Sequence, residues 1–228
     1  RSNVAPFANL IRLRYIYLDN ADITDLSPLT GLRNLELISL RSTPVRDVSP
    51  LAGIKSLKSL DLSFTKVIDL SPLARLTNLK NLDIGCTEVS DLSALATLTN
   101  LENLYIGGAP NVSDLGALAG LENLKTLCLN YTGIRDLSRL SKLQRLKVLE
   151  LEGVDVRDLT PLETLTNLEL LDINDTDVDD LAPLAALKKL KSLVINATRV
   201  NQKQMLPLKQ ALPHCDIKVS AVGPVTPP

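Results

Sequence analysis

Residues 57–73 read LKSLDLSFTKVIDLSPL, and this stretch decides the fold because it returns along the chain with little change. Successive copies start 22 residues apart, except for one interval of 23. The string Asp-Leu-Ser-Pro-Leu or a variant of it starts at Asp25, Asp47, Asp69, Asp91, Asp114, Asp136, Asp158 and Asp180. A fixed period of this length indicates a repeat architecture.

The first half of the unit predicts a short strand. We expect this strand at residues 60–62, where Leu60 and Leu62 point inward. Because side chains alternate along a strand, Asp61 lies on the opposite face.

The second half of the unit predicts a turn followed by a short helical segment. Thr65 turns the chain, and Val67 and Leu70 return to the core. Ser71 is suited to cap the helical turn with its hydroxyl, and Pro72 fits the first helical position, where its missing N–H costs nothing.

One such unit cannot bury its own apolar edge, so neighbouring units must stack. Stacked strands form a parallel sheet with a spacing of about 4.8 Å. The helical turns on the opposite side are wider than a strand, so the stack bends with the sheet inside. We therefore predict an α/β solenoid, a right-handed superhelix with a concave parallel sheet and short helical turns on the convex side.

The repeat also predicts the domain organisation. Residues 1–12 match the second half of a unit and indicate a partial N-terminal repeat or the remnant of a cap, so a preceding strand or cap is expected upstream. Residues 13–200 hold nine strand units, and residues 201–219 suit a capping helix and a final strand. The Pro-rich residues 220–228 resemble a linker or tail.

Composition excludes several function classes. The 228-residue chain has a net charge of -1, which gives no basic field for nucleic acid or an anionic membrane. No apolar run reaches the roughly 18 residues of a membrane span. Three cysteines without close spacing indicate free thiols in a reducing compartment.

The pattern Leu-x-x-Leu-x-Leu-x-x-Thr-x-Val-x-Asp-Leu-Ser-Pro-Leu resembles bacterial leucine-rich repeats of the internalin type and the related phosphatase-regulator class. The resemblance covers nearly the whole chain and implies a protein-binding solenoid. One departure is that the family usually has Asn where this chain has a series of threonines. A weaker ladder of turn hydrogen bonds is therefore expected at Thr43, Thr65, Thr87, Thr132, Thr176 and Thr198.

The concave face carries the candidate binding residues. All four tyrosines and Phe64 fall on it, whereas Phe7 lies elsewhere. Exposed rings on one face are typical of protein contacts, although tyrosine also suits a strand surface. The predicted partner-binding residues are Tyr15, Tyr17, Asp61, Phe64, Asp83, Tyr105, Tyr131, Glu150, Glu152, Asp172 and Asp175.

This face is also acidic, because those six carboxylates and Asp19 stand against Arg41 alone. A flanking row of bases softens the field: Arg14, Lys58, Lys80, Lys125, Lys147 and Lys191. We expect a protein partner, with a basic contact patch as a further hypothesis and ordinary solvated charge as the alternative.

We place the centre of the binding surface around Tyr105 and Tyr131. Gly85, Gly107 and Gly108 are expected to leave the floor open around these rings. The single 23-residue interval also falls here and predicts a bulge at the end of the strand.

The sequence predicts no catalytic residues, no metal site and no cofactor, so any catalytic domain would lie outside this segment. Three functions stay open: the recognition part of a bacterial effector or signalling protein, a secreted or surface adhesin of internalin type, and a regulatory subunit of an enzyme. We expect the cytoplasm, or delivery into a host cytosol, rather than secretion or the cell surface. The oligomeric state stays open.

Overall fold

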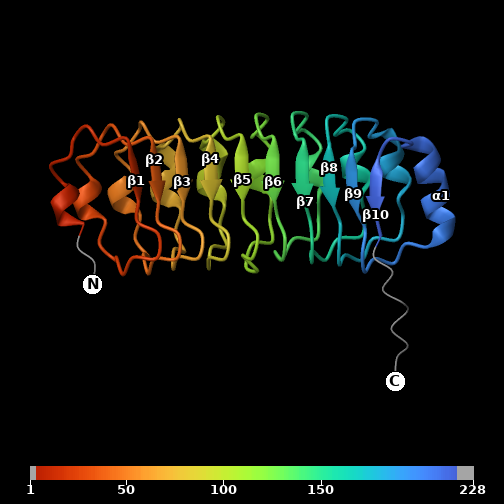
Figure 1. Ribbon diagram of the computed structural model, residues 1–228, viewed down its shortest axis with the longest axis horizontal. Coiled ribbons are helices and arrows are strands. Elements are labelled where there is room, and N and C mark those ends of the chain that lie inside the picture. Colours follow the sequence, from red (N-terminus) through yellow and green to blue (C-terminus); the bar gives the residue numbers. More distant parts are fainter. Residues whose placement is uncertain (1–3, 220–228) are drawn as a thin grey trace, which may run out of the picture.

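The computed structural model describes residues 4–219, so the tail expected at 220–228 lies outside the described residues. Within that range, ten short strands form one parallel sheet, and their order in the sheet is their order in the chain (Figure 1). The strands are β1 (Tyr15–Tyr17), β2 (Leu37–Ser39), β3 (Ser59–Asp61), β4 (Asn81–Asp83), β5 (Asn103–Tyr105), β6 (Thr126–Cys128), β7 (Val148–Glu150), β8 (Leu170–Asp172), β9 (Ser192–Val194) and β10 (Asp216–Lys218).

Short 3-10 helices alternate with the strands in the described chain, and a single α-helix follows β9. The 3-10 helices are η1 (Ala5–Phe7), η2 (Ser27–Leu29), η3 (Ser49–Leu51), η4 (Ser71–Arg75), η5 (Ser93–Thr97), η6 (Gly116–Leu118), η7 (Ser138–Leu140), η8 (Thr160–Leu162) and η9 (Ala182–Ala186), and the α-helix is α1 (Gln202–Ala211). Each turn of the chain thus contributes one strand and one helical segment, which is the α/β solenoid that the repeat predicts.

The core consists of the repeated leucine, isoleucine and valine positions. Leu60, Leu62, Val67, Leu70 and Leu73 are all buried, and the same positions in neighbouring units pack against them. Full burial of one such side chain contributes about 1.5–3 kcal/mol. Because every unit has the same shape, aliphatic residues fill the interior without large rings.

The strands lie one residue earlier than expected. In the quoted unit the strand is Ser59–Asp61 rather than residues 60–62. The chain leaves the sheet soon after Asp61, because Phe64 adopts a left-handed backbone with φ of +58°. Leu60 and Leu62 still point into the core, as the alternation predicts.

The expected serine cap is wrong, because the N-cap position of η4 is Leu70 and the aspartate before it accepts the hydrogen bond from the first helical N–H. Asp69 Oδ1 accepts a 2.8 Å hydrogen bond from the backbone N–H of Ser71, the first residue of η4. Ser71 is already helical, so its hydroxyl turns back to Asp69 at 2.9 Å. The aspartate bond to the N–H two residues on recurs at Asp25, Asp47, Asp91, Asp114, Asp136, Asp158 and Asp180.

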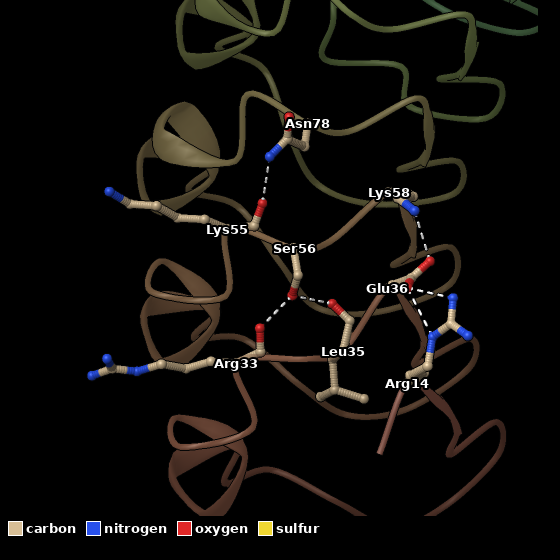
Figure 2. Close-up of polar contacts among 8 residues, drawn as sticks. All are labelled: Arg14, Arg33, Leu35, Glu36, Lys55, Ser56, Lys58 and Asn78. Carbon is tan, nitrogen blue, oxygen red and sulfur yellow. Dashed lines mark hydrogen bonds and ion pairs between the residues drawn. The ribbon is translucent and has the colours of Figure 1, made fainter. Parts of the chain in front are cut away.

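The threonines of the turn bond to adjacent backbone through their hydroxyls, as expected. Thr65 Oγ1 donates a 2.6 Å hydrogen bond to the carbonyl oxygen of Leu62 in its own unit, and four further threonines form the equivalent bond. A series of side-chain bonds from one unit to the preceding unit lies at the turn that enters the strands. Figure 2 shows Asn78 donating to the carbonyl of Lys55 at 2.8 Å. Equivalent bonds come from Asn34, Asn100, Asn123 and Asn167.

The sequence predicts a bulge at the end of the strand in the 23-residue interval, and this prediction is wrong. Strand pairing continues across it, with Tyr105 opposite Cys128. The additional length lies at the exposed Pro110–Asn111, in the turn after the strand. A Cβ on Gly133 in the next unit would be 2.7 Å from the Pro110 carbonyl oxygen, which explains the glycine there.

The helix α1 packs against η9 at the C-terminal end of the stack (Figure 1). It begins with a capping box in which Asn201 accepts from the backbone of Lys203, and Gln204 accepts from the backbone of Asn201. Leu208 and Leu212 are buried against the core.

Candidate functional site

The sheet face comprises the first and third residues of each strand and the two residues after the next core position. In the quoted unit these are Ser59, Asp61, Ser63 and Phe64. All eleven predicted partner-binding residues occupy such positions. Tyr15, Tyr17, Phe64, Tyr105, Tyr131 and Asp175 are exposed, and Asp61, Asp83, Glu150, Glu152 and Asp172 are half-buried.

The aromatic side chains form separate groups rather than one patch. Tyr15 and Tyr17 lie on the edge strand β1, and the guanidinium of Arg14 lies 5.3 Å from the Tyr15 ring. Phe64 has its own cation, because Arg41 lies 5.1 Å from its ring. Such cation–π contacts leave these rings partly occupied by the protein itself.

Phe64 and Tyr131 share a left-handed backbone conformation. The last sheet-face position of every unit from β1 to β9 has positive φ. A side chain other than glycine is uncommon in this region. The column contains Asn20, Ser42, Phe64, Cys86, Gly108, Tyr131, Gly153, Asp175 and Ala197.

The glycines near Tyr105 and Tyr131 do not leave open space around these rings, as the sequence predicts they should. The space beside Gly108 is filled by Cys86, whose Sγ lies 2.6 Å from where a Cβ would be. The glycine that accommodates a ring is Gly153, where a Cβ would lie 2.3 Å from Tyr131. Sequence reasoning missed Gly153, although it follows Tyr131 by one unit in the same column.

The segment formed by β6, β7 and β8 is tied together by polar side chains. Tyr131 donates a 2.7 Å hydrogen bond to Glu152 Oε1, and Asn174 Nδ2 donates to the same oxygen at 3.0 Å. Asn130 Nδ2 donates to Glu150 at 3.2 Å. Among the described side chains, Asn174 Oδ1 is the buried oxygen that accepts no hydrogen bond.

Carboxylates lie directly opposite one another at two places on the sheet face. Asp61 on β3 pairs with Asp83 on β4, and Glu150 on β7 pairs with Asp172 on β8. Burial is the main cause that raises the pKa of Asp83 and of Asp172, and nearby carboxylates add to it. Like charges in this arrangement oppose folding, so both pairs are held at a cost in stability.

The flanking row is less basic than expected, because every third member is a glutamate. Glu36 accepts from Arg14 and Lys58 (Figure 2), and the same arrangement recurs three and six units later. Glu102 pairs with Lys80 and Lys125, and Glu169 pairs with Lys147 and Lys191. The two lysines lower the pKa of Glu169 to about 2. The bases of this row are thus engaged with their own glutamates.

The described residues contain no cluster of three or more histidine, cysteine or acidic side chains that could hold a metal ion. Burial raises the pKa of the Cys128 thiol to about 12, so its thiolate is scarce at neutral pH. In the same part of the chain no helix is long and apolar enough to cross a membrane.

Comparison with known proteins agrees with this geometry. The family described as leucine-rich repeats (two copies) matches residues 55–97. Internalin C2 of Listeria monocytogenes superimposes with a TM-score of 0.78 at 25% identity, over 96% of this chain and 93% of that one. The chain is a leucine-rich-repeat solenoid that resembles the internalins.

Other leucine-rich-repeat structures extend the likeness. A second Listeria internalin has a TM-score of 0.75 at 26% identity, covering 97% of this chain and 73% of its own. A plant peptide hormone receptor, solved in complex with its ligand RGF2, shares the fold alone: its TM-score is 0.75 at 18% identity, over 91% of this chain and 36% of the receptor. No curated protein matches the sequence.

Proposed function

We propose that this leucine-rich-repeat chain is a protein-recognition module that binds its partner with the sheet face. The observation that carries the proposal is the confinement of the exposed tyrosines and Phe64 to that face. Tyrosine gives a large contact area with little loss of side-chain freedom, and it is enriched at binding hot spots. The plant receptor of the same fold supports this role, since it was solved with a bound ligand.

The partner carries a basic contact patch in this proposal. Four acidic residues of the sheet face form no ion pair within the described chain: Glu150, Glu152, Asp172 and Asp175. The lysines of the flanking row, in contrast, are already paired with glutamates. Unpaired surface carboxylates favour a cationic partner through charge complementarity.

We assign the module to a larger bacterial effector or signalling protein that acts in the cytoplasm or in a host cytosol. Three free cysteines support a reducing compartment. The likeness to two internalins favours a second candidate, a secreted or surface adhesin. Fractionation of the producing bacterium separates them: recovery in the outer membrane or culture medium, without entry into host cells, would favour the adhesin.

Binding is tested with two charge-matched variants. E150Q/E152Q/D172N removes three charges from the sheet face, and E88Q/E122Q/E163Q removes three from exposed positions elsewhere. Each protein is immobilised and exposed to bacterial and host lysates, and every captured protein is then purified and its affinity measured at low and raised salt.

We expect at least one protein whose direct binding is lost with the sheet-face variant, kept with the control variant, and weakened by salt. Equal binding of every captured protein by both variants contradicts the proposal.

A further inference from the structure

The third residues of the strands form a continuous row across the sheet face, which we call the central row. Strand register places them side by side: Tyr17, Ser39, Asp61, Asp83, Tyr105, Cys128, Glu150, Asp172, Val194 and Lys218. The row therefore holds two carboxylate pairs, with Tyr105 and Cys128 between them. The centres of the pairs are four strand spacings of about 4.8 Å apart, or about 19 Å.

Neither pair is neutralised by an ion pair in the described residues. Asp61 bonds to Ser63, and Asp83 accepts from the backbone of Gly85. Glu150 and Asp172 accept from Asn130 and from the backbone of Asn174. Of the cations on this face, Arg41 stacks on Phe64 and also lies near enough to Asp83 for its charge to lower the pKa of that carboxyl. Lys218 lies two strands beyond Asp172. Both pairs thus keep negative charge that a cationic group outside the chain can offset, although Arg41 already offsets part of it at Asp83.

The surface between the pairs is less polar than the pairs themselves. Tyr105 is 38% exposed, and burial is the main cause that raises the pKa of its phenol, so the neutral ring persists at physiological pH. Gly85 and Gly107 follow on β4 and β5 and carry no side chain, and a Cβ on Gly85 would meet the Gly107 carbonyl oxygen at 2.9 Å. The units therefore pack closely here, and Tyr105 is the exposed aromatic surface between the two pairs.

We propose that the central row binds one polypeptide segment with two clusters of arginine or lysine about 19 Å apart, running across the strands and packing its intervening residues on Tyr105. This inference rests on the proposed function and names the chemistry of its partner. One cationic cluster lies over Asp61 and Asp83, and the other over Glu150 and Asp172. The repulsion between the paired carboxylates destabilises the free protein, and a bound cation would relieve it.

The spacing is tested with fluorescein-labelled rulers of the form Arg-Arg-(Pro)n-Arg-Arg. A polyproline helix rises about 3.1 Å per residue, so n of 4 places the arginine pairs about 19 Å apart. Rulers with n of 1 and 10 place them about 9 Å and 37 Å apart with the same charge. We expect the middle ruler to bind about 10-fold more tightly than the other two by fluorescence anisotropy.

Two neutral variants, D61N/D83N and E150Q/D172N, show whether both pairs contribute. Each should lower the affinity for the peptide with n of 4 to that for the peptides with n of 1 and 10. The control variant E88Q/E122Q should leave the preference for n of 4 intact. Tyr105→Ala should weaken the middle ruler several-fold. Circular dichroism confirms that each variant is folded, and because the amides are isosteric with the acids, we expect no loss of structure.

Equal affinity for the three rulers overturns the proposal, as does a preference that survives loss of either pair or an absence of measurable binding. These failures leave the broader proposal of a basic protein partner standing. That proposal fails separately, when lysate proteins bind equally to the sheet-face and control variants.

Discussion

The phenol of Tyr131 reaches Glu152 in the next unit with a 2.7 Å hydrogen bond, and its ring covers Gly153. The bond to Glu152 is the main cause that raises the pKa of Tyr131. A side chain that is 52% exposed is thus held in one orientation before any partner arrives. Such a fixed ring loses less conformational entropy on binding.

Gly153→Ala should displace this ring. The new Cβ would lie 2.3 Å from Tyr131, and the backbone at φ of +66° disfavours alanine. We expect a loss of about 1–3 kcal/mol in the free energy of unfolding, measured by urea denaturation. Gly120→Ala, where no atom lies within 4 Å of the new Cβ, is the control. A loss at residue 153 no larger than at residue 120 would show that the ring moves freely.

The double variant Y105A/Y131A tests the predicted centre of the binding surface. If both rings are hot spots, affinity for a captured partner should fall by more than about 10-fold. Surface plasmon resonance measures the change, and Ile68→Ala, which removes an exposed apolar side chain outside the sheet face, is the control. A fall of less than about two-fold would remove both tyrosines from the site.

The capping aspartates should matter more than the serines that follow them. Asp69→Ala removes the acceptor of the Ser71 backbone N–H and should cost about 1 kcal/mol. Ser71→Ala keeps that bond and should cost less. Chemical denaturation of the two variants measures the difference, and a larger effect at Ser71 would restore the serine as the cap.

Acid should unfold the chain in a window set by its paired carboxylates. The pKa values of Asp25, Asp47, Asp91, Asp136 and Asp158 are lowered by bonds from the residue two positions on, and that of Glu169 falls to about 2. A folded-state pKa below the unfolded value gives stability that is complete above about pH 4.5 and is lost as the pH falls toward 2.

Asp83 and Asp172 act in the opposite sense, because their pKa values are raised in the folded chain. Their protonation should offset part of the loss at the upper end of that window. Urea denaturation at several pH values checks both effects, and D83N/D172N should remove the offset. Stability that rises steadily down to pH 2 would contradict the assignment.

The cysteines should differ in reactivity. Cys86 is exposed, whereas Cys128 is half-buried with a pKa of about 12. At pH 8 a thiol reagent should modify Cys86 at least about 100-fold faster than Cys128, because the thiolate is the reactive form. Mass spectrometry after short labelling identifies the modified residue, and Cys86→Ala should remove the fast phase.

The period and the leucine positions were sufficient to predict the solenoid, the inward side chains and the positions of the sheet face. These features follow from alternation along a strand and from stacking, which depend on the pattern rather than on any one side chain. The cap was misassigned because serine and aspartate are both good caps, and the choice depends on where the first helical residue lies.

The details of the candidate site depend on side-chain directions that the period does not determine. Nothing in the repeat alone shows that Tyr131 turns toward Gly153 or that Cys86 fills the space at Gly108. Glu36, Glu102 and Glu169 occupy the same position of the repeat as the bases of the flanking row, so the sequence also indicates their pairing with those bases. The eleven binding residues themselves stay a prediction until a partner is measured.

Ion pairing along the flanking row gives the solenoid a second, longer period of three units. Each set of three has a glutamate at its middle: Glu36, Glu102 or Glu169. Removal of the unit that carries Glu102 would place four lysines in succession, whereas removal of the unit that carries Lys80 would make Glu36 and Glu102 share one lysine. Removal of three consecutive units would join complete sets again. Length in this protein can therefore change in steps of three without a fault in its charge pattern, and an engineered relative should respect that step.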